Sequence, residues 1–225
     1  MDPATALPDT LCYLNGEFTA LKDAKISVMD RGFIFGDGVY EVVPAYAGKL
    51  FRFAQHMARL DRSLAELRIT NPLTHRTVFV MSNVMKLPGA EQRARGVACV
   101  TADDFRWEKA HIKSTSLLGA VFSRQISFDA GALETIMFRG DYLSEAAASN
   151  VWVIKDGTVM GPPRDQLVLE GIRYGLIEEI CRAAGIAFEL RRITRAEVRD
   201  ADELLLSSAT KEVLPVTLLD GQPVG

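Results

Sequence analysis

The pattern of hydrophobic and polar residues at the start of the chain predicts strands. Leu11 to Leu14 and Glu17 to Leu21 are two short runs joined by Asn15-Gly16, a pair that favours a type I′ hairpin turn. Gly38 to Tyr46 is rich in valine and tyrosine and predicts a further strand, in which Pro44 indicates an edge position or a bulge. We therefore expect the chain to begin with sheet structure.

The period of the apolar positions changes after residue 52. Apolar residues then recur at alternating spacings of four and three, which predicts one face of an amphipathic helix ending near Arg68: Phe53, Met57, Leu60, Leu64 and Leu67. Thr77 to Ser82 is a short apolar run, and Lys86-Leu87-Pro88-Gly89 then breaks the pattern. We place a domain boundary there, with a small domain at residues 1–86 and a larger domain at 87–225.

The larger domain is predicted to contain both strands and helices. Strands are expected at Val97 to Thr101, Thr135 to Phe138, Val151 to Ile154, around Val159 beyond a turn at Asp156-Gly157, and at Glu203 to Ser207. Helices are expected just after Lys113, over Ile172 to Cys181 with Gly185 as terminator, and from the capping box Thr194-x-x-Glu197. Without internal repeats, this mixture indicates an α/β or α+β enzyme-like architecture.

Composition and charge exclude several functional classes. The chain has 26 Lys and Arg against 29 Asp and Glu, a formal charge of -3, so it has no basic field for nucleic acid. No apolar run approaches the roughly 20 residues that span a bilayer. Residues 1–10 lack the basic start and apolar middle of a signal peptide. We expect a cytoplasmic protein that binds neither nucleic acid nor membrane.

Short motifs alone give little catalytic information. Cys12, Cys99 and Cys181 are far apart in apolar surroundings, which favours buried free thiols. The three histidines are too scattered to suggest a metal site, and no hydrolase elbow, P-loop or dinucleotide fingerprint is present. Phe35-Gly36-Asp37-Gly38 is typical of a tight turn. An isolated lysine such as Lys113 is usually a solvated surface residue.

Six segments taken in order carry more information than any one of them. They are DRGFIFGDGVYEVVPAY (30–46), HMARLDRS (56–63), IKSTSLLGAV (112–121), YLSEAAASNVWVIKDG (142–157), LEGIRYGLIEEI (169–180) and ADELLLSSATKEVLPV (201–216). Their content and order resemble the fold-type IV (class IV) aminotransferases, which use pyridoxal 5′-phosphate (PLP). The resemblance implies a small α/β sandwich domain followed by a larger mixed α/β barrel-like domain.

The resemblance implies roles for three residues near the reacting atoms. Lys113 corresponds to the lysine that forms a Schiff base with PLP and then moves the substrate Cα proton. Glu145 corresponds to the carboxylate that keeps the pyridine nitrogen protonated, and its alternative interpretation is a solvated loop glutamate. Tyr40 corresponds to an aromatic residue on the substrate side of the cofactor, although an ordinary core aromatic would give the same pattern.

The resemblance also implies a phosphate site. Arg59 corresponds to a phosphate-binding arginine, and its alternative is a helix-surface pair with Asp61 or Glu66. A helix start and a second loop would complete the cofactor site with Leu169, Gly171, Ile172, Ser208, Ala209 and Thr210. Arg173 and Ala209 stand where several family members carry hydroxyl residues, so the side-chain contacts to phosphate depart from the family pattern there.

The expected activity is transfer of an amino group from a D-amino acid such as D-alanine to a 2-oxo acid such as 2-oxoglutarate. The segments GDGVYEV, IKSTSLLGAV and SEAAASNV are most similar to the D-amino acid branch of the family. A branched-chain L-amino acid aminotransferase, an aminodeoxychorismate lyase and an inactive PLP-binding homologue are the alternatives. A homodimer is expected, because the family builds each active site at a subunit interface.

The chain departs from the family after Asn71 to His75. The family continues with a helix, a strand and a loop of basic residues that hold the substrate carboxylate, whereas here Arg76 runs directly into TVFVMS. The usual C-terminal helix of the family also has no counterpart in the sequence. A small domain shortened in this way would have an unpaired edge and an apolar face. The resemblance therefore gives no substrate-carboxylate ligands.

Overall fold

The computed structural model describes residues 10–69 and 77–225, and its N-terminal part contains a three-stranded antiparallel sheet. The strands are β1 (Leu11–Leu14), β2 (Glu17–Ala20) and β5 (Phe79–Met81), in the order β2-β1-β5. The predicted hairpin is confirmed, because Asn15 (φ 51°) and Gly16 (φ 106°) both have the positive φ that a type I′ turn requires. The predicted lack of signal-peptide character at the N-terminus and the predicted shortening after His75 concern residues that lie at or outside the limits of the described ranges.

The strand predicted over Gly38 to Tyr46 is wrong for most of its length. Only Ala45–Tyr46 (β3) is extended sheet, paired with Lys49–Leu50 (β4), and Val39 makes an isolated bridge to Ser114. Tyr40 N–H donates to Lys113 O at 3.1 Å, and Thr115 N–H donates to Gly38 O at 2.8 Å. The backbone of this segment therefore pairs with the loop around Lys113 and not with a neighbouring strand.

Two helices and a 3-10 turn complete the N-terminal part. The predicted second strand is one residue too long, because its last residue, Leu21, begins the 3-10 turn η1 (Leu21–Asp23). Helix α1 (Arg31–Phe35) begins at Asp30, whose carboxylate accepts from the first backbone N–H groups, and ends at Gly36 with φ 71°. The tight turn predicted there is confirmed.

Helix α2 (Phe53–Glu66) confirms the predicted helix but buries a different face. Its buried residues are His56, Arg59 and Ser63, while Phe53, on the predicted apolar face, is 46% exposed. Spacings of three and four residues place these polar side chains on one stripe. The stripe faces the protein interior, so α2 contributes hydrogen-bonding groups to a buried site.

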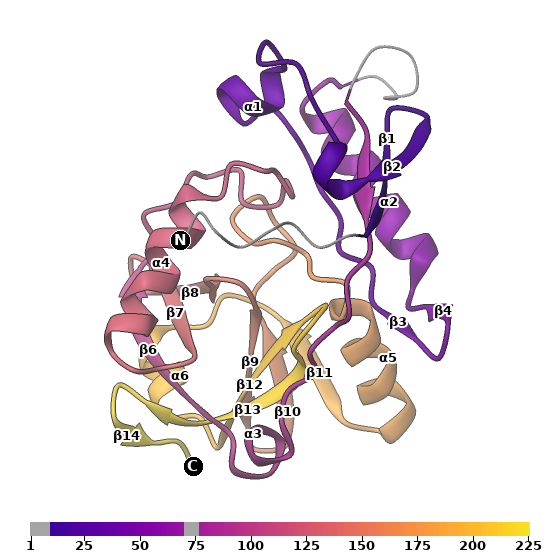
Figure 1. The fold of residues 1–225 in the computed structure, drawn as a ribbon. Coiled ribbons are helices and arrows are strands. Elements are labelled where there is room, and N and C mark those ends of the chain that lie inside the picture. Colours follow the sequence, from indigo (N-terminus) through magenta and orange to yellow (C-terminus); the bar gives the residue numbers. More distant parts are fainter. Residues whose placement is uncertain (1–9, 70–76) are drawn as a thin grey trace.

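Within residues 77–225, nine strands form one sheet in the order β11-β10-β9-β12-β13-β6-β7-β8, with β14 beside β13. The strands are β6 (Val97–Asp103), β7 (Glu134–Arg139), β8 (Tyr142–Ala146), β9 (Asn150–Lys155), β10 (Thr158–Gly161), β11 (Ala187–Leu190), β12 (Glu203–Ser208), β13 (Glu212–Leu219) and β14 (Gln222–Pro223). A short turn brings β8 into contact with β9, although they are far apart in the strand order. The sheet therefore curls into a half barrel (Figure 1).

Helices cover this curled sheet. They are α3 (Ala90–Arg95), α4 (Leu118–Asp129), α5 (Tyr174–Ala184) and α6 (Arg195–Arg199). α4 contacts β6 and β7, whereas α5 contacts β11 near the other end of the sheet order (Figure 1). The predicted terminator Gly185 (φ 69°) and the capping box of Thr194 and Glu197 are both confirmed.

The strands predicted in this part are confirmed, but β8, β11, β13 and β14 were not predicted. β8 has the greatest consequence, because it carries Glu145. Four of its five residues are buried, including polar Ser144 and Glu145, so the strand shows no alternation of apolar and polar positions. Buried polar side chains conceal the strand from sequence analysis.

The main core lies inside the curled sheet. Its fully buried members come from β7, β9 and β12 and include Ile136, Val151, Leu204 and Leu206. A second cluster joins α5 to the sheet, where the rings of Trp152 and Tyr174 lie 4.6 Å apart. All three cysteines are buried free thiols, as predicted.

Candidate active site

Lys113 lies in the loop between β6 and α4 and is held by residues of the N-terminal part. Its N–H donates to Ser63 Oγ on α2 at 3.3 Å, and its carbonyl accepts from Tyr40 N–H at 3.1 Å. The residue is half-buried, and Nζ lies 4.1 Å from the centroid of the Tyr40 ring. The fold thus brings Lys113 and Tyr40 together, and Lys113 is not a freely solvated lysine.

Glu145 lies buried on β8, 5% exposed. Its Oε1 accepts from Arg106 Nη1 at 2.9 Å, and its Oε2 accepts from Asn150 Nδ2 and Leu169 N–H, both at 3.2 Å. Burial raises the pKa of Glu145 from 4.5 to about 7, although Arg106 opposes this rise. The alternative interpretation of Glu145 as a solvated loop residue is therefore wrong.

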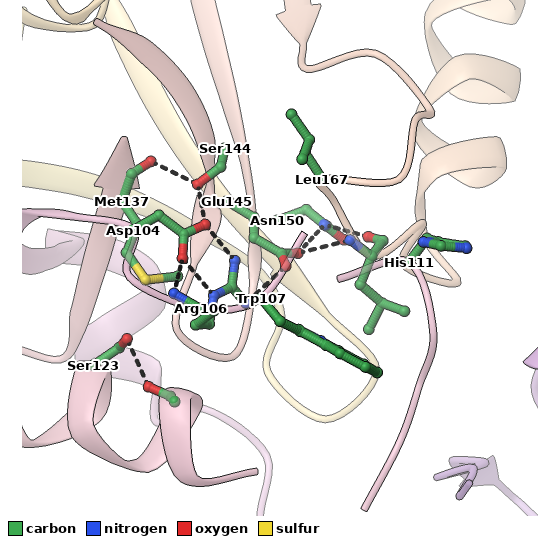
Figure 2. Close-up of polar contacts among 12 residues, drawn as sticks. Asp104, Arg106, Trp107, His111, Ser123, Met137, Ser144, Glu145, Asn150 and Leu167 are labelled. Carbon is green, nitrogen blue, oxygen red and sulfur yellow. Dashed lines mark hydrogen bonds and ion pairs between the residues drawn. The ribbon is translucent and has the colours of Figure 1, made fainter. Parts of the chain in front are cut away.

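Figure 2 shows Arg106 between two carboxylates, those of Asp104 and Glu145. Arg106 Nε and Nη2 each donate to Asp104 at 2.9 Å, so Asp104 accepts two hydrogen bonds from one edge of the guanidinium. Ser144 Oγ donates to Asp104 at 2.9 Å, and Arg139 approaches it to 3.3 Å. Burial opposes ionisation of Asp104, but the bonds from Arg106 outweigh it and lower the pKa of Asp104. Glu145 accepts a single hydrogen bond from the remaining nitrogen of the same arginine, Nη1.

Arg59, on the buried stripe of α2, pairs with Glu41. Arg59 Nε and Nη2 donate to the two oxygens of Glu41 at 2.7 and 2.6 Å, and Nη1 donates to Glu170 O at 3.2 Å. His56 Nδ1 lies 2.6 Å from Glu41 Oε2. Burial opposes ionisation of Glu41, but Arg59 and His56 outweigh it and lower the pKa of Glu41. The predicted alternative, a surface pair of Arg59 with acidic residues of its own helix, is wrong.

Two backbone segments with free N–H groups lie side by side. Gly171, Ile172 and Arg173 immediately precede α5, and Ala209 and Thr210 lie in the turn after β12. None of these five N–H groups donates a hydrogen bond within residues 10–69 and 77–225. Free N–H groups at a helix start attract anions.

Asn150 connects Glu145 to the segment before α5. Its Nδ2 donates to Leu169 O at 2.8 Å and to Glu145 Oε2 at 3.2 Å. A Cβ atom on Gly171 would lie 1.9 Å from Asn150 Oδ1, so only glycine fits there. Leu169, expected at the cofactor, makes its polar contacts to Glu145 and Asn150 through its backbone.

Arg173 ties the two N–H segments together. It is 6% exposed, and its Nε donates to Ser208 O at 2.8 Å. Nη2 donates to Tyr46 OH at 3.2 Å and to Ala209 O at 3.4 Å, and the guanidinium lies 4.7 Å from the centroid of the Phe51 ring. These contacts also hold the N-terminal part against the turn after β12.

A groove of about 750 Å³ lies beside this site, between α2 and residues 164–170. It contains neither Lys113 nor Glu145. Among its charged residues, Arg62 and Arg164 both pair with Glu170, and Arg59 pairs with Glu41 outside the groove. We therefore assign the chemistry to the buried residues and not to this groove.

Sequence analysis missed four of the charged or polar residues described above: Glu41, Asp104, Arg106 and Asn150. Glu41 carried a signal, because it is a lone acid inside the apolar run 38–46. Asp104 and Arg106 also carried one, since they follow a buried strand as an acid and a base two residues apart. Their partners, however, lie far away in the sequence.

Comparison with known families identifies the chain's relatives. The family model described as amino-transferase class IV matches residues 73–219. D-alanine aminotransferase of Staphylococcus epidermidis is 32% identical over 256 residues, covering 96% of this chain and 91% of the relative. D-alanine aminotransferase of Bacillus licheniformis is 32% identical over 252 residues, covering 94% and 89%. Both alignments are longer than the 225 residues of this chain, so the relatives carry additional residues inside the matched region.

Solved structures of aminotransferases share the fold of this chain. The branched-chain amino acid aminotransferase of Escherichia coli aligns with a TM-score of 0.86 and 23% identity, covering 97% of this chain and 89% of that one. A hypothetical aminotransferase from Mycobacterium tuberculosis in its PLP-bound form aligns with a TM-score of 0.83 and 20% identity, covering 96% and 93%. At this identity the likeness establishes the fold, which confirms the predicted mixed α/β architecture.

Two further structural findings concern other classes of site. Among the described residues, no group of three or more His, Cys, Asp or Glu side chains is arranged to hold a metal ion. Across the same residues, no helix combines the length and the hydropathy that crossing a membrane requires.

Proposed function

The chain belongs to the class IV aminotransferases, which depend on PLP, and on this premise we propose that it transfers the amino group of a D-amino acid, such as D-alanine, to a 2-oxo acid, such as 2-oxoglutarate. The 32% identity to D-alanine aminotransferases over nearly the whole chain supports the D-amino acid. The similarity of the fold to branched-chain enzymes supports aminotransferase chemistry without choosing a substrate.

The residues present suit PLP at both of its ends. The free N–H groups before α5 and after β12 form a cradle for a phosphate, and the absence of a Cβ atom on Gly171 lets Asn150 pack against this segment. At the other end, the Glu145 carboxyl suits a protonated ring nitrogen. We assign the phosphate to the side chain of Arg59 and to a group of loop residues: Gly171, Ile172, Ser208, Ala209 and Thr210.

The environment of Glu145 is the observation that carries the proposal. Burial makes its charged form costly, and its pKa near 7 means that a cation placed beside it would favour ionisation. When bound, PLP supplies an electron sink for cleavage of the substrate Cα–H bond. In our proposal Glu145 holds the proton on the ring nitrogen, while Arg106 and Asn150 hold Glu145 in position.

Lys113 is the proposed base. Its backbone is fixed by Tyr40 and Ser63, and its Nζ lies against the Tyr40 ring. From this position Lys113 takes the proton from the substrate Cα and returns it later in the reaction. Tyr40 covers one side of the lysine.

Borohydride reduction followed by peptide mapping tests the role of Lys113. The purified protein should carry a pyridoxyl label on Lys113, and Lys113→Ala should carry none. Lys211 and Lys155 are matched internal controls, because Lys211 Nζ is bound to Glu134 at 2.8 Å and Lys155 Nζ to Asp200 O at 2.7 Å. A label on either of these two lysines would overturn the assignment.

The absorbance change of the bound cofactor with each amino acid alone tests the substrate. D-alanine should convert PLP to pyridoxamine phosphate faster than L-leucine or L-valine does. Faster conversion by L-leucine would identify a branched-chain aminotransferase, and release of pyruvate from aminodeoxychorismate would identify a lyase. A yellow protein that converts none of these compounds would be an inactive homologue.

We also propose a homodimer. Leu118, Val121, Phe122 and Phe128 of α4 are all exposed large apolar residues. Such a concentration on one helix is typical of an interaction surface, and a second copy would cover it. Light scattering measures the mass in solution, and a stable, fully active monomer would refute the proposal.

Two further expectations remain proposals. A cytoplasmic location is supported by the three buried, unpaired thiols, which suit a reducing compartment. A domain division between residues 86 and 87 is supported by the two separate sheets, one containing β1, β2 and β5 and the other beginning at β6.

A further inference from the structure

The charge at the proposed phosphate site is incomplete if Arg59 is the only cation. Glu41 accepts two hydrogen bonds from Arg59, and both side chains are 6% exposed. The pair is therefore nearly neutral as a unit. A phosphate group would bring negative charge to this end of the site and would need a further cation to balance it.

Arg173 is a buried cation for which residues 10–69 and 77–225 provide no counter-ion. All of its hydrogen-bond acceptors are neutral: the carbonyls of Ser208 and Ala209 and the hydroxyl of Tyr46. Within the described residues, no carboxylate lies within salt-bridge distance of its guanidinium, and its Nη1 donates no hydrogen bond. The Phe51 ring offsets part of the cost of burying this charge, but a cation–π contact is weaker than a partner of opposite charge.

We propose that Arg173 is the second phosphate-binding cation of the cofactor site. This inference rests on the proposed function, because it takes PLP as the ligand. Arg173 lies directly beside the free N–H groups of Gly171 and Ile172, and it is bonded to the turn that carries those of Ala209 and Thr210. Several family members carry a hydroxyl residue at this position, whereas this chain has the positively charged Arg173 as a partner for the phosphate.

Titration of the apoprotein with PLP and with pyridoxal, which lacks the phosphate, tests the proposal. In Arg173→Met the dissociation constant of PLP should rise about 10- to 100-fold, the effect of losing a hydrogen bond to a charged group. The dissociation constant of pyridoxal should stay the same. Arg173→Lys, which keeps the charge, should retain most of the wild-type preference for PLP over pyridoxal.

Arg164→Met is the matched control. Arg164 is also close to α5, but its charge is balanced by Glu178 at 2.7 Å and Glu170 at 3.4 Å. Its loss removes the same charge from the chain and should leave both dissociation constants unchanged. An equal weakening of PLP and pyridoxal in Arg173→Met would show a purely structural role in the turn after β12, and no weakening of either would exclude any role.

The lysine variant keeps the test decisive if Arg173→Met does not fold. In that case Arg173→Lys and Arg173→Gln are compared, and equal preferences for PLP over pyridoxal in these two variants would overturn the proposal. A wild-type protein that binds no PLP at all would instead refute the proposed function, so the two failures are distinguishable.

Discussion

Two glutamate–arginine pairs lie in the candidate active site, and the pKa values of their carboxyl groups shift in opposite directions. Glu41 pairs with Arg59, and Glu145 pairs with Arg106. Each of the two glutamate side chains is only 6% exposed. The pKa of Glu41 is nevertheless lowered from 4.5, whereas the pKa of Glu145 is raised to about 7. A buried position beside an arginine therefore does not by itself fix the charge of a carboxylate.

Burial acts to raise both pKa values, and the arginines oppose that rise to different extents because each is shared differently. Arg59 gives two hydrogen bonds to Glu41, at 2.7 and 2.6 Å, and His56 adds a third contact. Arg106 gives two bonds to Asp104 and only one to Glu145, and the charge of Asp104 further disfavours ionisation of Glu145. Glu41 is thus a counter-ion of Arg59, while in our proposal Glu145 responds to a cation that arrives with a ligand.

Among the variants that test this comparison, Glu145→Gln should have the largest effect, on the rate of transamination. A neutral amide cannot hold a proton on the ring nitrogen, so transamination should slow by about 10²- to 10³-fold, the cost of removing one electrostatic contact from a transition state. The dissociation constant of PLP should change much less. Steady-state rates with D-alanine and a PLP titration of the apoprotein measure the two quantities.

Glu145→Asp is the control for this variant, because it keeps the charge and should lose less activity than the amide. The stability of Glu145→Gln should be near that of the wild type at pH 5, where the native carboxyl is protonated, and should exceed it at pH 7.5, where the buried carboxyl is charged. Unchanged turnover in the amide variant would mean that Glu145 is not the partner of the ring nitrogen.

Glu41→Gln should instead reduce stability. It leaves the buried Arg59 without its counter-ion, and breaking a buried ion pair in this way costs about 3–5 kcal/mol. The free energy of unfolding of the apoprotein in urea measures this loss. Inorganic phosphate should restore part of it by giving Arg59 a new partner. A variant within about 0.5 kcal/mol of the wild type would show that another group balances Arg59.

Sequence patterns predicted the elements in which burial follows a regular period. The helix α5 with its terminator Gly185 and the turn at Asp156-Gly157 are confirmed for this reason. The same logic failed on β8 and on the buried face of α2, where polar residues point into the protein. A prediction from periodicity assumes that polar positions are exposed. It therefore misses strands and helix faces whose polar residues are buried for a function.

The candidate site depended on resemblance and not on periodicity. Lys113 and Glu145 were named because the segments around them resemble a family. Arg106 was missed because its bond to Glu145 spans 39 residues, and Glu41 because its bonds to Arg59 span 18. Only the fold brings these partners together, and a single sequence carries no signal of contacts at such separations.

The two carboxylates should make stability depend on pH in opposite directions. The folded-state pKa of Glu145 is raised, so the folded apoprotein holds an extra proton between about pH 4.5 and 7, and stability falls as pH rises through that window. The fall should be about 3 kcal/mol. Glu41, whose pKa is lowered, contributes stability that is present above pH 4.5 and is lost as pH falls below it.

Urea unfolding of the apoprotein at pH 5, 6 and 7.5 measures this slope, and subtracting the curve of Glu145→Gln isolates the carboxyl. Addition of PLP should flatten the slope, because a positive ring nitrogen favours the charged form of Glu145. A wild-type slope identical to that of Glu145→Gln would place the pKa of Glu145 near its ordinary value and remove the contrast with Glu41.

Glu179 with Arg52 is a third glutamate–arginine pair, and it separates the effect of burial from that of hydrogen-bond number. It has two hydrogen bonds, at 2.8 and 2.9 Å, but Glu179 is 54% exposed. Because water screens such a pair, Glu179→Gln should have the smallest effect, a midpoint of thermal unfolding within about 2 °C of the wild type. Thermal melts beside Glu41→Gln, at low and high salt, make the comparison direct. A loss as large as that of Glu41→Gln would mean that hydrogen-bond number alone sets the strength of these pairs, whatever their exposure to solvent.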